Sequence, residues 1–286
     1  MSNLSDPGYV RELLARHGLH LQKALGQNFL INPTVCPRMA ELSGADGHTP
    51  VLEIGPGIGV LTVELARRAE KVLAVELDRR LCPVLDETLA DCPNVALLQG
   101  DILKLDLRQT AEEYFGGKEF AVCANLPYYI TSPILMALLE TPLPLKSITV
   151  MVQKEAAQRI CAAPGTRECG AVSAAVWYHA EPKMLFSVGR GSFLPPPKVD
   201  SAVLRLDIRK TPPVEVADEA LFFETARAAF SQRRKTAANS IASAGRYKKP
   251  EIETALAVLG IPANIRAEQL TLEQMAALAN LLIKGV

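Results

Sequence analysis

The sequence lacks three features that would have indicated a particular cellular setting. No two cysteines stand in CxxC spacing, no apolar run reaches about 18 residues, and the N-terminus lacks the pattern of a signal peptide. The six cysteines occur at positions 36, 82, 92, 123, 161 and 169. We therefore expect unpaired core cysteines in a reducing cytoplasm, no metal site and no membrane span.

The net charge of the chain also gives no indication of its partners. The 286 residues carry 31 basic and 31 acidic side chains, so only the distribution of charge along the chain can indicate a nucleic-acid partner. The composition is 49% hydrophobic, which is enough for a sizeable core. This length suits one large domain, or one large domain and one small one. The chain shows no internal repeat and no low-complexity tract.

The most informative stretch is Asn125-Leu126-Pro127-Tyr128. It follows an apolar run at 120–124 that predicts a buried strand. It precedes Thr131-Ser132-Pro133, which predicts a helix start with a hydroxyl N-cap followed by proline. Open α/β sheets bind ligands at the carboxyl ends of their strands. An amide and an aromatic ring at that place suit a planar base with an exocyclic amine, although an ordinary strand-to-helix turn is the alternative.

Two further strand ends carry groups suited to a nucleoside. The predicted strand 51–54 is followed by Gly55-Pro56-Gly57-Ile58-Gly59, whose glycines allow the backbone to approach a ligand closely. The predicted strand 72–75 ends in Glu76, 21 residues after Gly55, where a carboxylate can bind a ribose diol. The third glycine of the loop arrives one residue too early for the G-x-G-x-x-G fingerprint of dinucleotide enzymes.

A third polar residue, Asp101, follows a strand predicted at 95–98. An aspartate in this place is usually a turn residue, but as the third member of a series we expect it to face the same cleft. A fifth strand is predicted at 147–152 and a sheet-closing strand at 202–208. Helices are predicted at 7–16, 33–42, 60–68, 79–89, 134–139, 153–161 and 170–178. Strands that alternate with helices predict an α/β fold.

The composition changes after Thr211-Pro212-Pro213, which we interpret as a linker. Residues 1–210 are expected to form the α/β domain, and residues 211–286 a small all-α domain. The second domain takes its helices from segments with helical apolar spacing at 219–230, 236–244, 251–259 and 272–283.

The segment between Thr225 and Lys249 contains basic residues and no acid. Its cations are Arg227, Arg233, Arg234, Lys235, Arg246, Lys248 and Lys249. A solvated helix face normally mixes the two signs, so seven uncompensated cations indicate a phosphate-binding surface, with solubility alone as the alternative. Three consecutive residues of a helix cannot share a face, so one or two of Arg233, Arg234 and Lys235 are expected to reach phosphate.

Seven motifs occur along almost the whole chain: KALGQNFL at 23–30, LEIGPGIGVLT at 52–62, VELD at 75–78, GDIL at 100–103, NLPYYITSPI at 125–134, SFLPPPKVDSAV at 192–203 and FSQRRKT at 230–236. In this order they resemble the ribosomal RNA adenine dimethyltransferases, most closely the bacterial small-subunit branch. The resemblance implies a Rossmann-like class I S-adenosylmethionine-dependent methyltransferase sheet and a helical C-terminal rRNA-binding domain.

The resemblance also implies an activity. It is N6,N6-dimethylation of two adjacent adenosines in the 3′-terminal hairpin loop of 16S rRNA within the small ribosomal subunit or its precursor, with a role in subunit biogenesis. The enzyme is expected to be a cytoplasmic monomer that needs no metal.

Residue by residue, the resemblance implies three sets of contacts. The S-adenosylmethionine set is Gln27, Asn28, Leu30, Gly55, Gly57, Glu76, Leu77, Asp101, Ile102 and Asn125. Glu76 would hold the ribose, and Asp101 with the Ile102 backbone would read the adenine. The target set is Asn125, Leu126, Pro127, Tyr128 and Phe193, with Asn125 and the Leu126 carbonyl on the amine and the two rings on the base. The rRNA set is Arg227, Arg233, Arg234 and Lys235.

Three alternatives stay open on this reading: the erythromycin-resistance branch acting on large-subunit rRNA, an amino-DNA methylase, and a non-catalytic RNA-binding or transcription factor. The Asn-Leu-Pro-Tyr form disfavours the DNA enzymes, and the segment 192–203 favours the small-subunit branch. The intact Gly55, Glu76, Asp101 and Asn125 argue against loss of cofactor binding. One departure is Val188-Gly189-Arg190-Gly191, which lacks an expected proline and affects only the shape of that loop.

Overall fold

A computed structural model of the chain describes residues 4–19 and 28–285. The described chain forms two compact units. Unit 1 is Met1–Ala157 with Lys183–Ile208, and unit 2 is Gln158–Pro182 with Arg209–Val286. One break lies close to the predicted linker. Residues 158–182, which the sequence assigns to the first domain, belong to unit 2.

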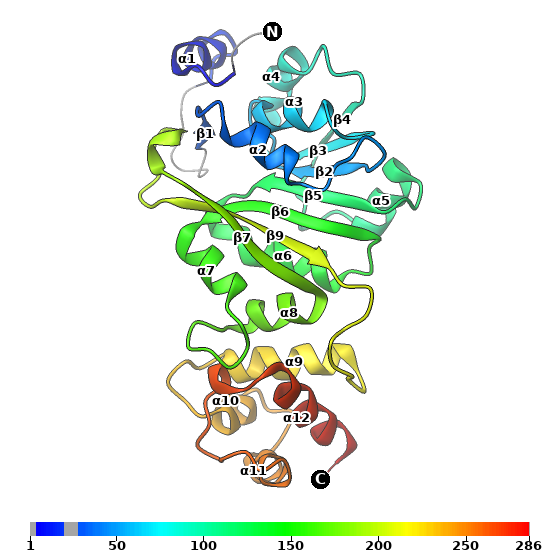
Figure 1. Ribbon diagram of the computed structural model, residues 1–286, viewed down its shortest axis with the longest axis vertical. Helices are drawn as coiled ribbons and strands as arrows, with labels where there is room; N and C mark the ends of the chain where they lie inside the picture. The colour runs from blue at the N-terminus through cyan, green and yellow to red at the C-terminus, as the bar shows by residue number, and fades with distance from the viewer. Residues whose placement is uncertain (1–3, 20–27, 286) are drawn as a thin grey trace. The chain divides into compact units, whose positions relative to one another are not determined.

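Unit 1 is built on a mixed sheet (Figure 1). Seven strands of the described chain form it in the order β4-β3-β2-β5-β6-β9-β7. They are β2 (Val51–Ile54), β3 (Val72–Glu76), β4 (Val95–Gln99), β5 (Phe120–Asn125), β6 (Leu145–Gln153), β7 (Ala180–Val188) and β9 (Ser201–Ile208). Neighbours from β4 to β6 pair in parallel, and β9 is antiparallel to β6. The predicted Rossmann-like α/β sheet is confirmed.

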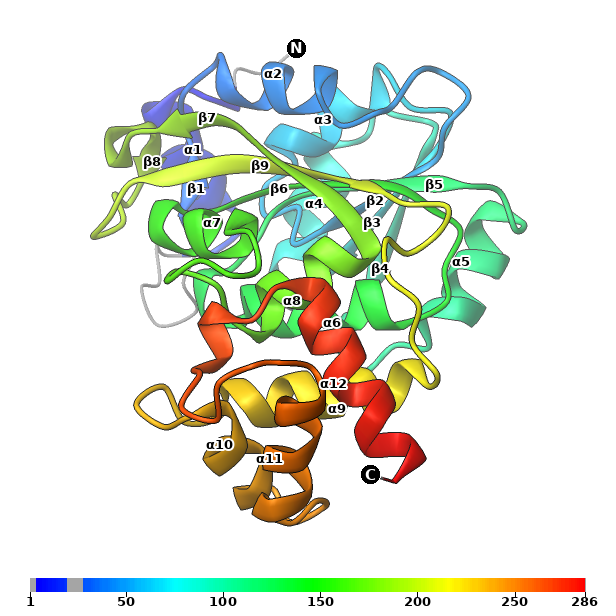
Figure 2. The same ribbon diagram turned by 60° about the horizontal axis from the view of Figure 1, so that its bottom comes forward.

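Helices cover both faces of this sheet. The helices of this part of the chain are α1 (Pro7–Arg16), α2 (Val35–Glu41), α3 (Val60–Ala66), α4 (Cys82–Thr88), α5 (Leu107–Phe115), α6 (Thr131–Glu140) and α7 (Lys154–Cys161). Helix α1 packs against α4 rather than on the sheet, and the second half of α7 belongs to unit 2. In both views α2 and α3 lie on one side of the sheet and α6 on the other (Figures 1 and 2). Parallel strands covered in this way are apolar throughout, and β5 is buried in all but its last residue.

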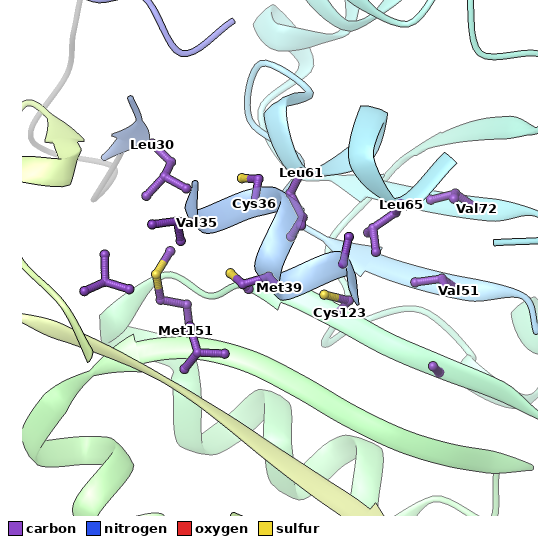
Figure 3. Close-up of a cluster of buried hydrophobic side chains, with 14 of the residues drawn as sticks. Leu30, Val35, Cys36, Met39, Val51, Leu61, Leu65, Val72, Cys123 and Met151 are labelled. Carbon is purple, nitrogen blue, oxygen red and sulfur yellow. The ribbon is translucent and has the colours of Figure 1, made fainter. Parts of the chain in front are cut away.

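The core between the sheet and helices α2 and α3 is continuous (Figure 3). It joins Met39 of α2 and Leu65 of α3 to Met151 of β6. Cys36 and Cys123 belong to the same cluster, and the chain's cysteines are free thiols. Burial raises the pKa of both thiols well above the usual range, so they stay neutral and pack as small apolar groups, as predicted.

Two predictions for the sheet need correction. The sequence does not predict β7, and β9 does not close the sheet, because it lies between β6 and β7. The segment of β7 carries Glu181, Pro182 and Lys183, which are typical of an edge strand and break the apolar pattern of an interior one.

Two helix predictions differ as well. The sequence patterns do not predict α5 (Leu107–Phe115), although Asp106 caps its first turn and Gly116 ends it with a φ of 60°. The predicted hydroxyl cap of α6 is wrong, because the helix begins at Thr131 and its N-cap is Ile130, which provides no side-chain cap. The turn Tyr128–Ile130 is already a short 3₁₀ helix and leads directly into α6.

A two-residue ribbon holds the N-terminal segment against the segment that follows β7. Strand β1 (Phe29–Leu30) pairs antiparallel with β8 (Phe193–Leu194), so that Leu30 lies opposite Phe193. Three of these four side chains are buried. The ribbon therefore fixes the backbone on the C-terminal side of Asn28.

Unit 2 is mostly helical. Its helices are α8 (Ala171–His179), α9 (Glu219–Phe230), α10 (Ala237–Ser243), α11 (Lys249–Val258) and α12 (Leu272–Lys284), and the four C-terminal helices agree with prediction to within two residues at each end. Helix α8 joins them because Tyr178 packs on Phe222 and Phe223, with ring centroids 5.3 and 5.2 Å away. Of the helices in the described chain, none is long and apolar enough to span a bilayer.

Candidate active site

The sheet of unit 1 opens a crevice where the chain changes the side on which it adds strands. From β2 the chain adds β3 and β4 on one side, and it then returns to add β5 on the other side of β2. Connections leave the carboxyl ends of β2 and β5 in opposite directions, and open α/β sheets bind ligands at this point. A cavity of about 380 Å³ lies there, with walls drawn entirely from unit 1.

The glycine loop after β2 forms one wall of the cavity. The Gly55 N–H donates to the Val75 carbonyl at 2.9 Å, which extends the pairing with β3 beyond the end of β2. Gly57 and Gly59 have φ values of 64° and 88°, which residues with a side chain rarely adopt. A Cβ at Gly59 would also come within 3.0 Å of the Thr88 hydroxyl. Gly55 and Gly57 therefore bring bare backbone to the cavity wall, whereas Gly59 lets the loop pass close to α4.

Glu76 ends β3 beside this loop. Its carboxylate is buried and accepts two backbone hydrogen bonds, from the Gly57 N–H to Oε2 at 3.2 Å and from the Asp78 N–H to Oε1 at 2.8 Å. Burial raises the pKa of Glu76, and these two N–H groups offset part of the effect. Each oxygen can accept a further hydrogen bond. The oriented carboxylate therefore suits the two neighbouring hydroxyls of a ribose.

Strand β4 delivers Asp101 and Ile102 to the same cavity. Asp101 Oδ1 accepts the Leu103 N–H at 3.1 Å, and the Lys104 ammonium lies 3.6 Å from Oδ2. Ile102 is buried and lines the cavity wall. An acceptor beside an apolar wall suits a purine that carries an amino group.

The end of β5 supplies an amide, a carbonyl and an aromatic ring. Asn125 is the last residue of β5, and the buried Leu126 donates its N–H to the Met151 carbonyl at 3.1 Å. Within the described parts of the chain, no donor is bonded to the Asn125 side-chain oxygen or to the Leu126 carbonyl. Pro127 and the half-buried Tyr128 follow directly, and all four residues line the cavity. Two acceptors and one ring are thus presented together.

Most of the predicted site residues meet in this cavity. Those that line it are Asn28, Leu30, Gly55, Gly57, Glu76, Leu77, Asp101, Ile102, Asn125, Leu126, Pro127 and Tyr128. Gln27 lies outside the described residues. The predicted rRNA contacts Arg227, Arg233, Arg234 and Lys235 belong to unit 2.

Phe193 does not line the cavity. Its ring is 2% exposed and packs in the core cluster of unit 1 that contains Leu30. The β1–β8 ribbon sets this position, because it places Phe193 directly opposite Leu30. The structure therefore gives Phe193 a supporting place behind the N-terminal wall of the cavity rather than a place beside the target base.

Glu53 also lines the cavity, although it is not among the predicted site residues. It is 1% exposed, and its Oε2 has no hydrogen-bond partner in the described structure. Burial raises the pKa of Glu53 to about 8, and the charge of Glu76 adds to the effect. In addition to burial, the charge of Glu53 in turn raises the pKa of the Cys36 and Cys123 thiols, and among the described residues no cation contributes to the pKa of Glu53. The sequence feature that could have identified Glu53 is its place as an acidic residue inside an otherwise apolar strand.

Replacing Glu53 by glutamine should change how the stability of the ligand-free protein depends on pH. Glutamate in an unfolded chain has a pKa of about 4.3, so between there and about 8 the folded state binds a proton that the unfolded state has released. Stability should therefore fall as the pH rises through this window, by a few kcal/mol from Glu53 alone. The glutamine variant cannot ionise, and its decline should be smaller in thermal unfolding from about pH 5 to about pH 8.

Glu41→Gln is the matched control, since Glu41 is an exposed glutamate on α2. It should reproduce the decline of the wild type. Parallel curves for Glu53→Gln and wild type would show that Glu53 is already ionised in the folded protein.

The chain matches a known family over nearly its whole length. Residues 18–284 match the family described as ribosomal RNA adenine dimethylase. A relative from Geobacillus thermodenitrificans, named Ribosomal RNA small subunit methyltransferase A, is 46% identical over 285 residues, which cover 98% of this chain and 97% of the relative. A relative of the same name from Shouchella clausii is 47% identical over 283 residues, with 98% and 96% covered.

Solved structures share the fold. The crystal structure of the 23S rRNA methyltransferase ErmE superposes with a TM-score of 0.67 at 30% identity, covering 90% of this chain and 100% of that one. A dimethyladenosine transferase from Plasmodium falciparum gives 0.70 at 25% identity, with 87% and 95% covered. The predicted methyltransferase fold is thereby confirmed. This chain is a member of the ribosomal RNA adenine dimethylase family, the S-adenosylmethionine-dependent enzymes that its motifs resemble.

Proposed function

We propose that this enzyme dimethylates N6 of two adjacent adenosines in the 3′-terminal hairpin loop of 16S rRNA during biogenesis of the small ribosomal subunit. The observation that carries the proposal is one cavity in which Asn125, Leu126 and Tyr128 lie together with Glu76 and Asp101. The name of the relatives, which specifies the small subunit, favours this substrate over large-subunit rRNA.

The cavity residues fit S-adenosylmethionine, which supplies an electrophilic methyl group on a sulfonium when bound. Glu76 would accept hydrogen bonds from the ribose, Asp101 and the Ile102 backbone would read the adenine, and the Gly55 loop would approach the methionine portion. The unpartnered Oε2 of the buried Glu53 favours a ligand that carries positive charge. The remaining proposed contacts are Gln27, Asn28, Leu30, Gly57, Leu77 and Asn125.

The residues after β5 would prepare the target amine. The exocyclic amine of adenine is a poor nucleophile because its lone pair is delocalised into the ring. The Asn125 oxygen and the Leu126 carbonyl would accept its two hydrogens and favour a pyramidal nitrogen whose lone pair points at the methyl group. Pro127 restricts the backbone between these acceptors and Tyr128. Catalysis would then come from positioning and electrostatics.

Tyr128 would stack on the target base, which has to leave its own stack to enter the cavity. Burial raises the pKa of Tyr128, so its hydroxyl stays protonated at neutral pH and is not a general base. The amine proton would leave after methyl transfer. The second transfer uses a monomethylated amine with one N–H, so one acceptor loses its donor while the stack persists.

The proposed domain roles place the chemistry in residues 1–210 and rRNA contact in residues 211–286, through the turn between α9 and α10. Arg233, Arg234 and Lys235 are exposed in this turn, after α9 ends at Phe230. They are not helical, so the geometric limit on three consecutive helix residues does not apply to them. All three can therefore engage one stretch of phosphates, and the exposed Arg227 lies one turn before the end of α9.

Two cations of the basic segment 225–249 are paired with acids in the structure, although the segment itself contains none. Arg246 forms a salt bridge with Glu224 at 3.3 Å, and Lys249 forms one with Glu253 at 3.5 Å. Both acids lie outside the acid-free segment in sequence. These two cations are therefore weaker candidates for phosphate contact than those of the turn.

The proposal also covers the cellular location and the oligomeric state of the enzyme. We place the enzyme in the cytoplasm, where it would work as a monomer, since one chain supplies every group that the transfer requires. A direct displacement needs no Lewis acid and no redox step, so no metal is assigned. The monomer is supported by the cavity, whose lining residues all belong to unit 1 of one chain.

Asn125→Ala should slow methyl transfer by about 10²–10³-fold, because one positioned acceptor for the amine is lost. The dissociation constant for S-adenosylmethionine should change little. Single-turnover methylation of under-methylated small subunits, with mass mapping of the modified adenosines, measures the first effect, and calorimetry measures the second. Asn264→Ala, at an exposed asparagine of unit 2, is the control. Near-wild-type transfer by Asn125→Ala would remove Asn125 from the mechanism.

Glu76→Ala should weaken S-adenosylmethionine binding by roughly 10- to 100-fold, because the ribose would lose a charged acceptor. Calorimetry on folded protein gives the dissociation constant directly. Glu70→Ala removes an exposed glutamate just before β3 and should leave the constant unchanged. Equal constants for Glu76→Ala and wild type would show that the ribose binds elsewhere.

Replacing Arg233, Arg234 and Lys235 together by alanine should weaken binding to small-subunit RNA and leave S-adenosylmethionine affinity alone. Each lost phosphate contact should also flatten the dependence of log affinity on log salt by roughly 0.7. Salt titrations of RNA binding measure both effects. The double variant Arg246→Ala/Lys249→Ala removes the paired cations and should change the slope less. Coincident lines for triple variant and wild type would exclude the turn from the RNA contact.

A further inference from the structure

The hydroxyl of Tyr128 is held by a serine that is not among the proposed site residues. The Tyr128 hydroxyl oxygen lies 2.6 Å from Ser201 Oγ, a hydrogen-bond distance. Ser201 is fully buried and is the first residue of β9. A tyrosine whose hydroxyl is held in this way loses rotational freedom about its side-chain bonds.

One strand, β6, holds both parts of the target site, the amine acceptors and the stacking ring. On one edge of β6, Met151 pairs with Asn125 and its carbonyl accepts the Leu126 N–H. On the other edge, Gln153 pairs with Ser201, which bonds Tyr128. The amine acceptors and the stacking ring are therefore both positioned by residues of β6 only two places apart, which fixes the ring plane relative to the acceptors.

We propose that Ser201 is a positioning residue that sets the plane of the Tyr128 ring, and that it matters most for the second methylation. The proposal rests on the proposed function. In the first transfer two hydrogen bonds at the amine and the stack together orient the adenine. In the second transfer the amine has one N–H, so the orientation of the base depends more on the plane of the stacked ring.

Ser201→Ala should slow the first transfer by roughly three- to ten-fold, as expected for the loss of one hydrogen bond. It should slow the second transfer more, so that N6-monomethyladenosine accumulates. The dissociation constant for S-adenosylmethionine should not change. Tyr128→Phe, which keeps the ring and loses the hydroxyl, should give the same product ratio. The double variant should be no slower than Tyr128→Phe, because both changes remove one interaction.

Ser147→Ala is the matched control. Ser147 is another fully buried serine of this sheet, and its Oγ donates to the Ser43 carbonyl at 2.9 Å. Its loss should lower stability as much as the loss of Ser201 does, with the rates and the ratio of monomethyl to dimethyl product unchanged. An unchanged product ratio for Ser201→Ala, or additive rate losses in the double variant, would overturn the proposal.

A measurement without RNA separates this proposal from the proposed function. The bond from Ser201 lowers the pKa of Tyr128, so Ser201→Ala should raise that pKa further, as followed by the NMR signal of the Tyr128 ζ carbon. Tyr128→Phe identifies the signal. Absence of methyl transfer by the wild type would refute the proposed function, whereas an unshifted Tyr128 titration in Ser201→Ala would refute the anchoring bond whatever the substrate.

Discussion

The site depends on one constraint, the parallel pairing of β2 with β3 on one edge and with β5 on the other. Parallel strands bring their carboxyl ends to the same edge of the sheet. The glycine loop, Glu76 and Asn125 therefore meet around one cavity, although 70 residues separate Gly55 from Asn125. Strand β6 extends the same support, since it pairs with both β5 and β9 and so carries the residues on either side of Tyr128.

Buried acids give this cavity its electrostatic character. Glu53 and Glu76 both have raised pKa values because burial disfavours their charged forms. Glu76 is oriented by backbone N–H groups, whereas Glu53 has an oxygen without a partner in the described structure. Such an arrangement is unfavourable in an empty cavity and favours a cationic ligand, because a nearby positive charge stabilises the ionised carboxylate. The electrostatics thus agree with a sulfonium cofactor.

Charge is used differently in unit 2. There the cations of the turn after α9 are exposed, and Arg246 and Lys249 are paired with Glu224 and Glu253. Exposed cations attract phosphate without regard to sequence, whereas the roles proposed for the enclosed groups of unit 1 depend on particular atoms of a base and a cofactor. The two units therefore suit the two tasks of an enzyme that modifies single bases in a large RNA.

The sequence by itself determined the parts of this protein that depend on near neighbours: the apolar parallel strands, the glycine loop, the polar residues at three strand ends and the motifs that identify the family. Only the tertiary structure decided the edge position of β7, the burial of Phe193, the Oε2 of Glu53 that lacks a partner among the described residues and the bond between Ser201 and Tyr128. The physical reason is that burial and electrostatic pairing are set by residues far apart in the chain. The apolar runs of buried parallel strands and the glycines of a tight loop, by contrast, are local and leave a readable pattern, whereas the edge strand β7 and the caps of α5 and α6 did not.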